Sequence, residues 1–253
     1  MNKQTKYWII GIIAVGIILL IWLGISGSRS SKGGNTPDTG VTESSPAAGL
    51  GNSTAEDPHA GMDHGQSTSS DQATASYLKE QDTIMANMMK DMEDIPTTGS
   101  AAIDYLNGMI PHHESAVAMA ESYLKHGGTE PDLVALAGDV IEVQTKEIEQ
   151  MQAMVKDLEE NEAKNNDMEA AYLEEYQKLF AAHHESHMSE AAESVDEAFA
   201  EGMILHHQMA ADMSKIILEY TDQKDVKELA QNIIDVQEQE IDQMQEILKK
   251  LSH

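Results

Sequence analysis

The sequence GMIPHH at residues 108–113 recurs as GMILHH at 202–207. A second block, IEVQTKEIEQMQ at 141–152, recurs as IDVQEQEIDQMQ at 234–245, at almost the same spacing. Matched blocks of this length predict an internal duplication, with two similar halves related by an approximate twofold axis.

Each half has the pattern of three helices, because Glu, Ala, Leu, Met, Gln and Lys dominate and apolar residues recur every three or four positions. Ser194 with Glu197, and Thr129 with Asp132, fit capping boxes. No stretch has the period-two alternation of a strand, so no sheet is predicted. The predicted helices cover residues 77–93, 101–126, 130–158, 169–190, 195–220 and 222–251. The sequence therefore predicts an all-α, ferritin-like antiparallel bundle of two three-helix halves, 76–160 and 168–251, within the domain 76–253.

The amino-terminal part has a different composition. Residues 7–25 form an unbroken apolar run that would be roughly 28 Å long as a helix, close to the thickness of a bilayer core. We predict one transmembrane helix in residues 1–25, with a cleaved signal peptide as the alternative. Residues 26–75 are rich in Ser, Gly, Thr and Asp, which predicts a flexible linker. Both alternatives place the helical domain outside the cytoplasm, at the cell surface or in the periplasm.

The overall composition excludes several classes of function. A formal net charge of −28 argues against nucleic acid as a partner, because phosphate binding needs a basic face. The absence of Cys excludes thiolate metal sites and thiol catalysis. The 16 Met and 11 His residues are numerous enough to need an explanation.

Methionine and histidine side chains form matching stripes on the predicted helices of the two halves. In the first half the candidate metal ligands are Met109, His112, His113, Met119, Glu147 and Met151. In the second half they are Met203, His206, His207, Met213, Glu240 and Met244. A His that donates to Glu147 would fix the imidazole tautomer and leave the other ring nitrogen free for a metal. Thioether sulfur combined with imidazole suits Cu(I). The alternatives are that each Met fills the core and that the His–Glu pair is structural.

Three further groups of residues are candidates for metal binding. The first predicted helix carries Met85, Met88, Met89 and Met92, and the equivalent region of the second half carries His183, His184, His187 and Met188. The linker carries His59, Met62 and His64, which predicts a segment that captures ions first, or a chance cluster. An exposed polar helix face is the alternative for the His group.

The predicted helices lack the Glu-x-x-His motif of di-iron bundles and the H-E-x-x-H motif of zinc proteases. The chain also has no Gly-rich phosphate loop. These absences argue against di-iron oxidation, zinc proteolysis and nucleotide chemistry.

The sequence MIPHHESAVAMA at 109–120, followed by Gln144-x-x-Glu147-Ile-x-x-Met151, resembles the signature of a bacterial ferritin-like family of "domain of unknown function" proteins. That family includes copper-resistance proteins of the CopM type. The resemblance covers roughly residues 76–251 and occurs in both halves. It implies an exported helical bundle that binds copper through His and Met and limits copper toxicity. The second half departs from the motif at Leu205, where the motif has Pro, and at Gln208, which replaces Glu114.

Together these features predict a membrane-tethered, extracytoplasmic protein that binds copper, as Cu(I), for sequestration or handover in copper tolerance. A metal-dependent, ferritin-like oxidoreductase and a structural or interaction bundle without metal are the alternatives, and whether the protein is an enzyme stays open. The predicted partners are copper ions, the membrane and a metal-exchange protein. The sequence does not indicate the oligomeric state.

Overall fold

The computed structural model describes residues 69–184 and 192–252, and the regular elements in those ranges are all helices. The helices are α2 (Ser69–Glu93), α3 (Ala101–Lys125), α4 (Pro131–Asn161), α5 (Asn166–His184), α6 (Val195–Tyr220) and α7 (Lys224–Leu251). These bounds follow the predicted ranges closely for four helices. Helix α2 begins at Ser69, before the predicted domain start at residue 76, and α5 begins at Asn166 and is described only to His184, whereas its predicted range is 169–190.

The predicted fold needs one correction, which concerns the membrane. None of the described helices is both long and apolar enough to cross a bilayer. Even the most apolar helices, α3 and α6, carry several charged side chains along their length, and charge is expensive within a hydrocarbon layer. The fold of the described residues is therefore an all-helical bundle without a transmembrane helix. The predicted span at 7–25 lies outside the described residues, as does most of the predicted linker.

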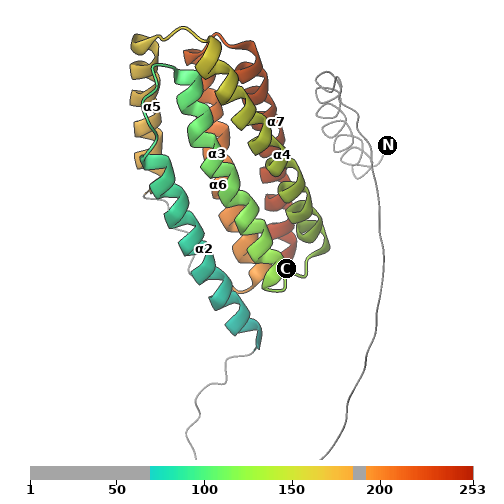
Figure 1. The fold of residues 1–253 in the computed structure, drawn as a ribbon. Helices are drawn as coiled ribbons and strands as arrows, with labels where there is room; N and C mark the ends of the chain where they lie inside the picture. The colour runs from blue at the N-terminus through green and yellow to red at the C-terminus, as the bar shows by residue number, and fades with distance from the viewer. Residues whose placement is uncertain (1–68, 185–191, 253) are drawn as a thin grey trace, which may run out of the picture. The chain divides into compact units, whose positions relative to one another are not determined.

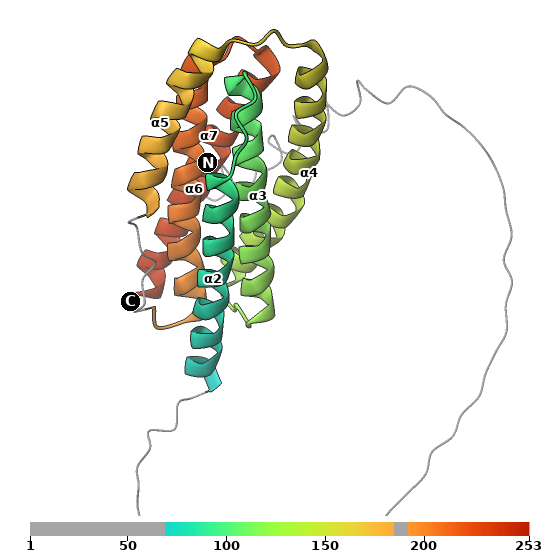
Figure 2. The same cartoon turned by 60° about the vertical axis from the view of Figure 1, so that its left-hand side comes forward.

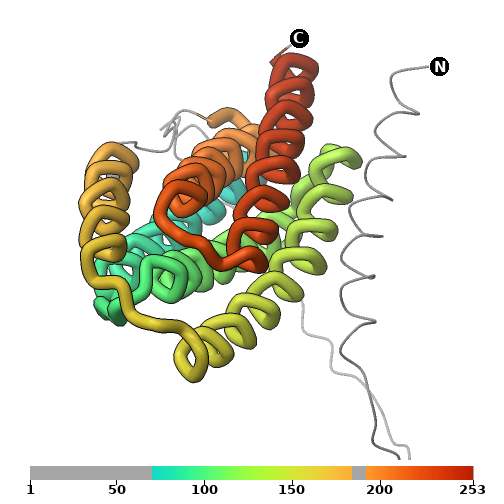
Figure 3. Tube along the Cα trace, turned by 90° about the horizontal axis from the view of Figure 1, so that it is seen from above, coloured from blue at the N-terminus to red at the C-terminus, as the bar shows by residue number. Residues whose placement is uncertain are grey.

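Helices α3 and α6 form the centre of the bundle and run antiparallel to each other (Figure 1). Helices α4 and α7 lie on one side of this pair, and α2 and α5 lie on the other (Figures 1 and 3). Figure 2 shows the second side, where α5 covers one end of the central pair and α2 extends past the other end. The two halves of the chain thus contribute one central and two outer helices each.

The sequence explains why α3 and α6 are central. Both are apolar or small around most of their circumference and are buried on most faces, as expected of a helix enclosed by others. Gly108 allows neighbouring elements to approach α3, since a Cβ there would lie 2.8 Å from Ile95 Cδ1 and 3.5 Å from Met213 Cε. By contrast, α7 buries a single stripe, which is typical of an outer helix.

The helix caps confirm one sequence prediction in part and correct another. Ser194 Oγ accepts a hydrogen bond from the Glu197 backbone N–H at 3.1 Å, which is the first half of the predicted capping box. The Glu197 carboxylate accepts from the Glu193 N–H at 2.6 Å in place of the Ser194 N–H. The predicted capping box at Thr129 is wrong, because the N-cap of α4 is Glu130 and makes no side-chain cap. Thr129 instead donates from its hydroxyl to Asp196 Oδ2 at 2.8 Å. Asp196 also accepts from the Tyr123 hydroxyl at 2.5 Å. A carboxylate from the second half therefore holds the α3–α4 connection.

A buried pair of carboxyl groups fixes the connection between α2 and α3. Asp104 is 1% exposed and accepts hydrogen bonds from the Thr98 N–H at 3.2 Å and the Thr98 hydroxyl at 2.6 Å. Glu169 of α5 is also buried and accepts from the Gly99 N–H. Burial, with a smaller contribution from Glu169, raises the pKa of Asp104 to about 6, although the Thr98 bonds oppose the shift. The bundle therefore holds Asp104 more easily in its neutral form.

This pKa gives a testable pH dependence. A carboxyl group whose folded pKa is raised binds its proton more tightly in the folded state, so its ionisation destabilises the fold as pH rises from about 4 through about 6. Asp104→Asn removes the ionisation and keeps an oxygen that accepts from Thr98. We expect the variant to gain about 1–2 kcal/mol relative to the parent between pH 4.5 and pH 8. Urea unfolding of both proteins across this range measures the difference, and a constant difference would contradict the assignment.

Candidate metal centre

The equivalent histidines of the two halves meet at the crossing of α3 and α6. The ring centroids of His112 and His206 are 3.8 Å apart, with an angle of 44° between the ring planes. His112 is 0% exposed and His206 is 1% exposed. The stripes that were predicted separately for each half thus share one centre, because the helices that carry them pack face to face.

The neighbouring histidines point to carboxylates on the outer helices. His113 Nε2 lies 2.9 Å from Glu147 Oε2 and forms the predicted hydrogen bond. His207 Nε2 lies 2.8 Å from Glu240 Oε2, although this contact lacks hydrogen-bond alignment. His113 and His207 are fully buried, and the Glu147 and Glu240 side chains are 9% and 18% exposed where α4 and α7 face each other. Each half therefore uses its outer helix to orient the second His of its motif.

Ser115 sets the tautomer of His206, and the sequence analysis did not select it. The Ser115 hydroxyl donates to the His112 carbonyl oxygen at 2.6 Å. The same oxygen is 2.6 Å from His206 Nε2, so it accepts the proton on that nitrogen. His206 Nδ1 then carries the lone pair and is buried without a hydrogen-bond partner. In the other ring, Nδ1 and Nε2 of His112 are both buried without a partner.

Electrostatics keep this pair neutral. Burial lowers the pKa of His112 well below its usual value, and the charges of His206, His113 and His207 lower it further. Burial and the charges of His207 and His113 lower the pKa of His206 in the same way, while a backbone hydrogen bond to His112 opposes the shift. Neutral imidazole is the form that binds metal ions.

Methionines from both halves of the chain pack together in two apolar clusters, which are equivalent by the internal repeat. Met109 of α3 packs in one apolar cluster with Met151 and Met213, and Gly108 places α3 close to the Met213 methyl group. Met119 packs in a second cluster with Met203 and Met244. These six thioethers are fully buried. On their own helices, Met109 and Met203 lie one turn from His112 and His206 respectively.

The structure also places one methionine that the sequence analysis passed over. Met209 is 2% exposed and packs in the cluster of Met109 and Met213. In the repeat, position 209 of α6 corresponds to position 115 of α3, where Ser115 contacts the opposite histidine. The repeat register could have identified Met209. The equivalent position of the first half is Ser115, however, so a comparison of the Met stripes of the two halves did not select it.

The remaining predicted ligands lie on α2 and α5 or have side chains that the structure does not describe. Met88 and Met92 of α2 are buried in the cluster of Met109, and Met85 and Met89 pack against it. His183 of α5 is half-buried, its Nδ1 lies 3.1 Å from the Leu179 carbonyl oxygen, and its charge contributes to lowering the pKa of His112. Nothing is described of the side chains of His184, His187, Met188, His59, Met62 and His64.

Within the described ranges, no group of three or more His, Cys, Asp or Glu side chains could hold a metal ion. The His pair supplies only two imidazoles. A metal ion bound there with more than two protein ligands therefore needs a ligand of another type, and thioether sulfur is the type that the surrounding clusters offer.

The profile of a family described as "domain of unknown function (DUF305)" matches residues 52–155 and 104–248. The chain belongs to the DUF305 family. Two overlapping matches are expected of a DUF305 chain that carries the signature twice. No curated protein matches the chain.

Three solved structures are similar to this DUF305 chain. CopM in the Cu(I)-bound form is 26% identical with a TM-score of 0.46, over 60% of this chain and 98% of that one. CopM in the Ag-bound form is 26% identical with a TM-score of 0.45, over 59% and 96%. A DUF305 fragment from Deinococcus radiodurans is 23% identical with a TM-score of 0.43, over 61% and 99%. With TM-scores below 0.5, these likenesses add nothing to the argument about this chain's site, which rests on its own side chains.

The Ser115 bridge predicts a loss of stability when it is removed. Ser115→Ala removes the side-chain acceptor of the buried His206 Nε2–H and leaves only the backbone hydrogen bond to His112, which costs about 0.5–1.5 kcal/mol. The matched control is Ser122→Ala on the same helix, because Ser122 is also buried but its hydroxyl has no partner. Urea unfolding of the metal-free protein should therefore show a clear loss for the first variant and almost none for the second. Equal losses would contradict the assigned tautomer.

Proposed function

We propose that this protein binds copper as Cu(I), for sequestration or handover, at the centre formed by His112 and His206. One observation carries the proposal. Two buried, neutral imidazoles lie in ring contact and present three nitrogen atoms without hydrogen-bond partners. An unpaired polar group in a protein interior costs free energy, so each such group calls for a ligand or another explanation.

The surroundings favour a soft, monovalent ion. Beyond the two imidazoles, the buried apolar clusters on either side are rich in thioethers. The buried Glu147 carboxylate bonds His113 at 2.9 Å and not the His pair itself. Imidazole and thioether ligands together select Cu(I) over harder ions. Since both ligands are neutral, a +1 ion places less charge in the interior than a +2 ion would.

The geometry gives roles to the other residues of the motif. His206 binds through Nδ1, because Ser115 holds its Nε2 proton. On the two central helices Met109 lies three residues before His112, and Met203 lies three residues before His206. Met209, three residues after His206, is the candidate beside His112 by the repeat relation. His113 and His207 are oriented by carboxylates at the outer helices and stand as secondary ligands.

The composition fits a storage or transfer role. The net charge of −28 attracts cations diffusely, which raises their concentration near the bundle. Thioether ligands do not form disulfides, so they suit an exported protein. Export remains a proposal, supported by the apolar run at 7–25, which lies outside the described residues.

The central test replaces both rings with apolar side chains of similar volume. His112→Leu with His206→Leu should lower the Cu(I) stoichiometry of the anaerobic protein. The metal-free variant should keep its stability, because two rings with three unpaired nitrogen atoms leave the core, which offsets the loss of the Ser115–His206 bond. The Ser115 hydroxyl still bonds the carbonyl oxygen of residue 112. Cu(I) should raise the melting temperature of the parent, since a ligand that binds only the native state stabilises it by RT ln(1 + [L]/Kd).

The control is His126→Gln, which changes a histidine that bonds Glu80 at 2.8 Å at the edge of the bundle. This variant should keep the parental Cu(I) stoichiometry. If Cu(I) does not change the melting temperature of the parent, the result would favour a structural bundle that binds no metal. A double variant that binds like the parent would show that the ligands lie elsewhere.

A second test concerns the thioethers. Met109→Leu, Met203→Leu and Met209→Leu in one protein remove three sulfur atoms at nearly constant volume, so unfolding should change by less than about 1.5 kcal/mol per site. The affinity for Cu(I) should fall at least tenfold, measured by competition with a chromophoric Cu(I) chelator. Met168→Leu is the control, because Met168 lies on α5, packs in neither thioether cluster and is not a candidate ligand. A loss of affinity in Met168→Leu as large as in the triple variant would overturn the choice of thioethers.

A further inference from the structure

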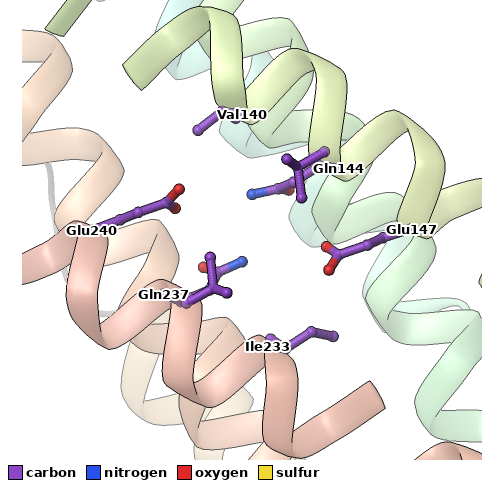
Figure 4. Close-up of a pocket in the computed structure, with 8 residues that line it drawn as sticks. Val140, Gln144, Glu147, Ile233, Gln237 and Glu240 are labelled. Carbon is purple, nitrogen blue, oxygen red and sulfur yellow. The ribbon is translucent and has the colours of Figure 1, made fainter. Parts of the chain in front are cut away.

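A small groove lies between α4 and α7, on the side of the bundle opposite α2 and α5 (Figures 3 and 4). Its free volume is about 10 Å³, which is close to the space that one water molecule needs. The lining consists of four residues from each helix, and each is the repeat equivalent of one on the other: Val140, Val143, Gln144 and Glu147 of α4, and Ile233, Val236, Gln237 and Glu240 of α7. The groove therefore follows the twofold relation of the bundle.

Two amide side chains project into this groove from opposite helices (Figure 4). Gln144 is 3% exposed and Gln237 is 2% exposed. The Oε1 atom of each is buried without a hydrogen-bond partner. Buried amides normally bond with protein or ordered water, so a matched pair of unpaired oxygens indicates a place where a polar ligand or cation is accommodated.

The groove also connects solvent with the buried histidines. Glu147 and Glu240 line it, and each carboxylate lies within 3 Å of a buried ring, at 2.9 Å from His113 Nε2 and 2.8 Å from His207 Nε2. His113 and His207 are in turn the chain neighbours of His112 and His206. The ring centroids are 6.3 Å apart for His112 and His113 and 6.1 Å apart for His206 and His207. Polar side chains thus occur in steps from the α4–α7 groove to the His pair.

We propose that the α4–α7 groove is a transient cation site and the port through which Cu(I) reaches and leaves the His pair. The amide oxygens of Gln144 and Gln237 and the carboxylates of Glu147 and Glu240 replace the solvent ligands of the ion as it passes between the helices. This inference rests on the proposed copper binding at His112 and His206 and adds the path that the ion takes.

The chemistry of the groove suits passage better than storage. Oxygen is a hard donor and holds Cu(I) more weakly than imidazole or thioether does. A transit site has to bind an ion well enough to admit it and weakly enough to release it. Two carboxylates at the port also attract cations from the surrounding solution. The ion therefore moves from weak oxygen donors outside to soft donors inside.

The test separates rates from equilibrium in the full-length protein. Gln144→Leu with Gln237→Leu replaces both amides with apolar side chains of similar size. Cu(I) is supplied anaerobically as its acetonitrile complex, and its release is followed by capture with excess bicinchoninate. We expect loading and release to slow by the same factor, at least tenfold, while stoichiometry and Kd stay at parental values. A change in the rates without a change in Kd identifies the groove as a path, because replacing a ligand of the stored ion would change Kd as well.

Two further variants make the test independent of any folding defect. Val143→Ala with Val236→Ala widens the groove and should speed both loading and release. Gln81→Leu is the matched control, because Gln81 of α2 is also fully buried with an unpaired Oε1 but lies outside the groove. Its loading rate should equal that of the parent.

The outcomes distinguish the two proposals. In the first outcome the parent binds Cu(I), and both the double glutamine variant and the double valine variant exchange it at parental rates. The proposed port is then wrong, and the proposed copper site stands. If the glutamine variant weakens Kd, the amides hold the stored ion, and the port is again wrong. If the parent itself binds no Cu(I), both the proposed function and the port fail.

Discussion

The contact between His112 and His206 is the constraint around which the bundle is organised. Two imidazoles can lie 3.8 Å apart in a protein interior only if they are not both charged, because two charged rings would repel each other strongly in a medium of low polarity. Their lowered pKa values follow from this burial. The Ser115 bridge then fixes where one proton resides. A polar centre is thereby built into the middle of the two most apolar helices.

The His112–His206 centre lies between two apolar clusters, where it lowers the stability of the fold and provides the proposed binding site. The cluster of Met109 and the cluster of Met119 would pack more favourably without unpaired nitrogen atoms between the central helices. Buried polar groups without partners are a recognised mark of functional sites, where stability is given up for binding. The unpaired amides of the α4–α7 groove extend the same pattern toward solvent. Both features lie on the approximate twofold axis.

The two halves are similar but not equivalent. Position 115 of α3 holds a serine that bonds the opposite histidine, whereas the corresponding position of α6 holds Met209. As a result His206 has one defined tautomer and His112 keeps both nitrogen atoms unpaired. The first half also has Pro111 inside α3, where the second half has Leu205, and both helices nevertheless run without a break. A duplicated sequence has thus produced one asymmetric centre instead of two equal sites.

The sequence by itself determined the helices, their order and the duplication, because apolar periodicity and repeated motifs are local properties of the chain. It also predicted that a histidine would bond Glu147, since an unpaired carboxylate at the margin of a core is costly. Local pattern could not assign that bond to His113 instead of His112, because both rings lie near the same helix face. Only the packing of α3 against α6 decided that histidines from different halves meet, that Ser115 holds one of them and that matched glutamines line a groove. These contacts join residues far apart in sequence, so they depend on the register between helices, which no single stretch of the chain encodes.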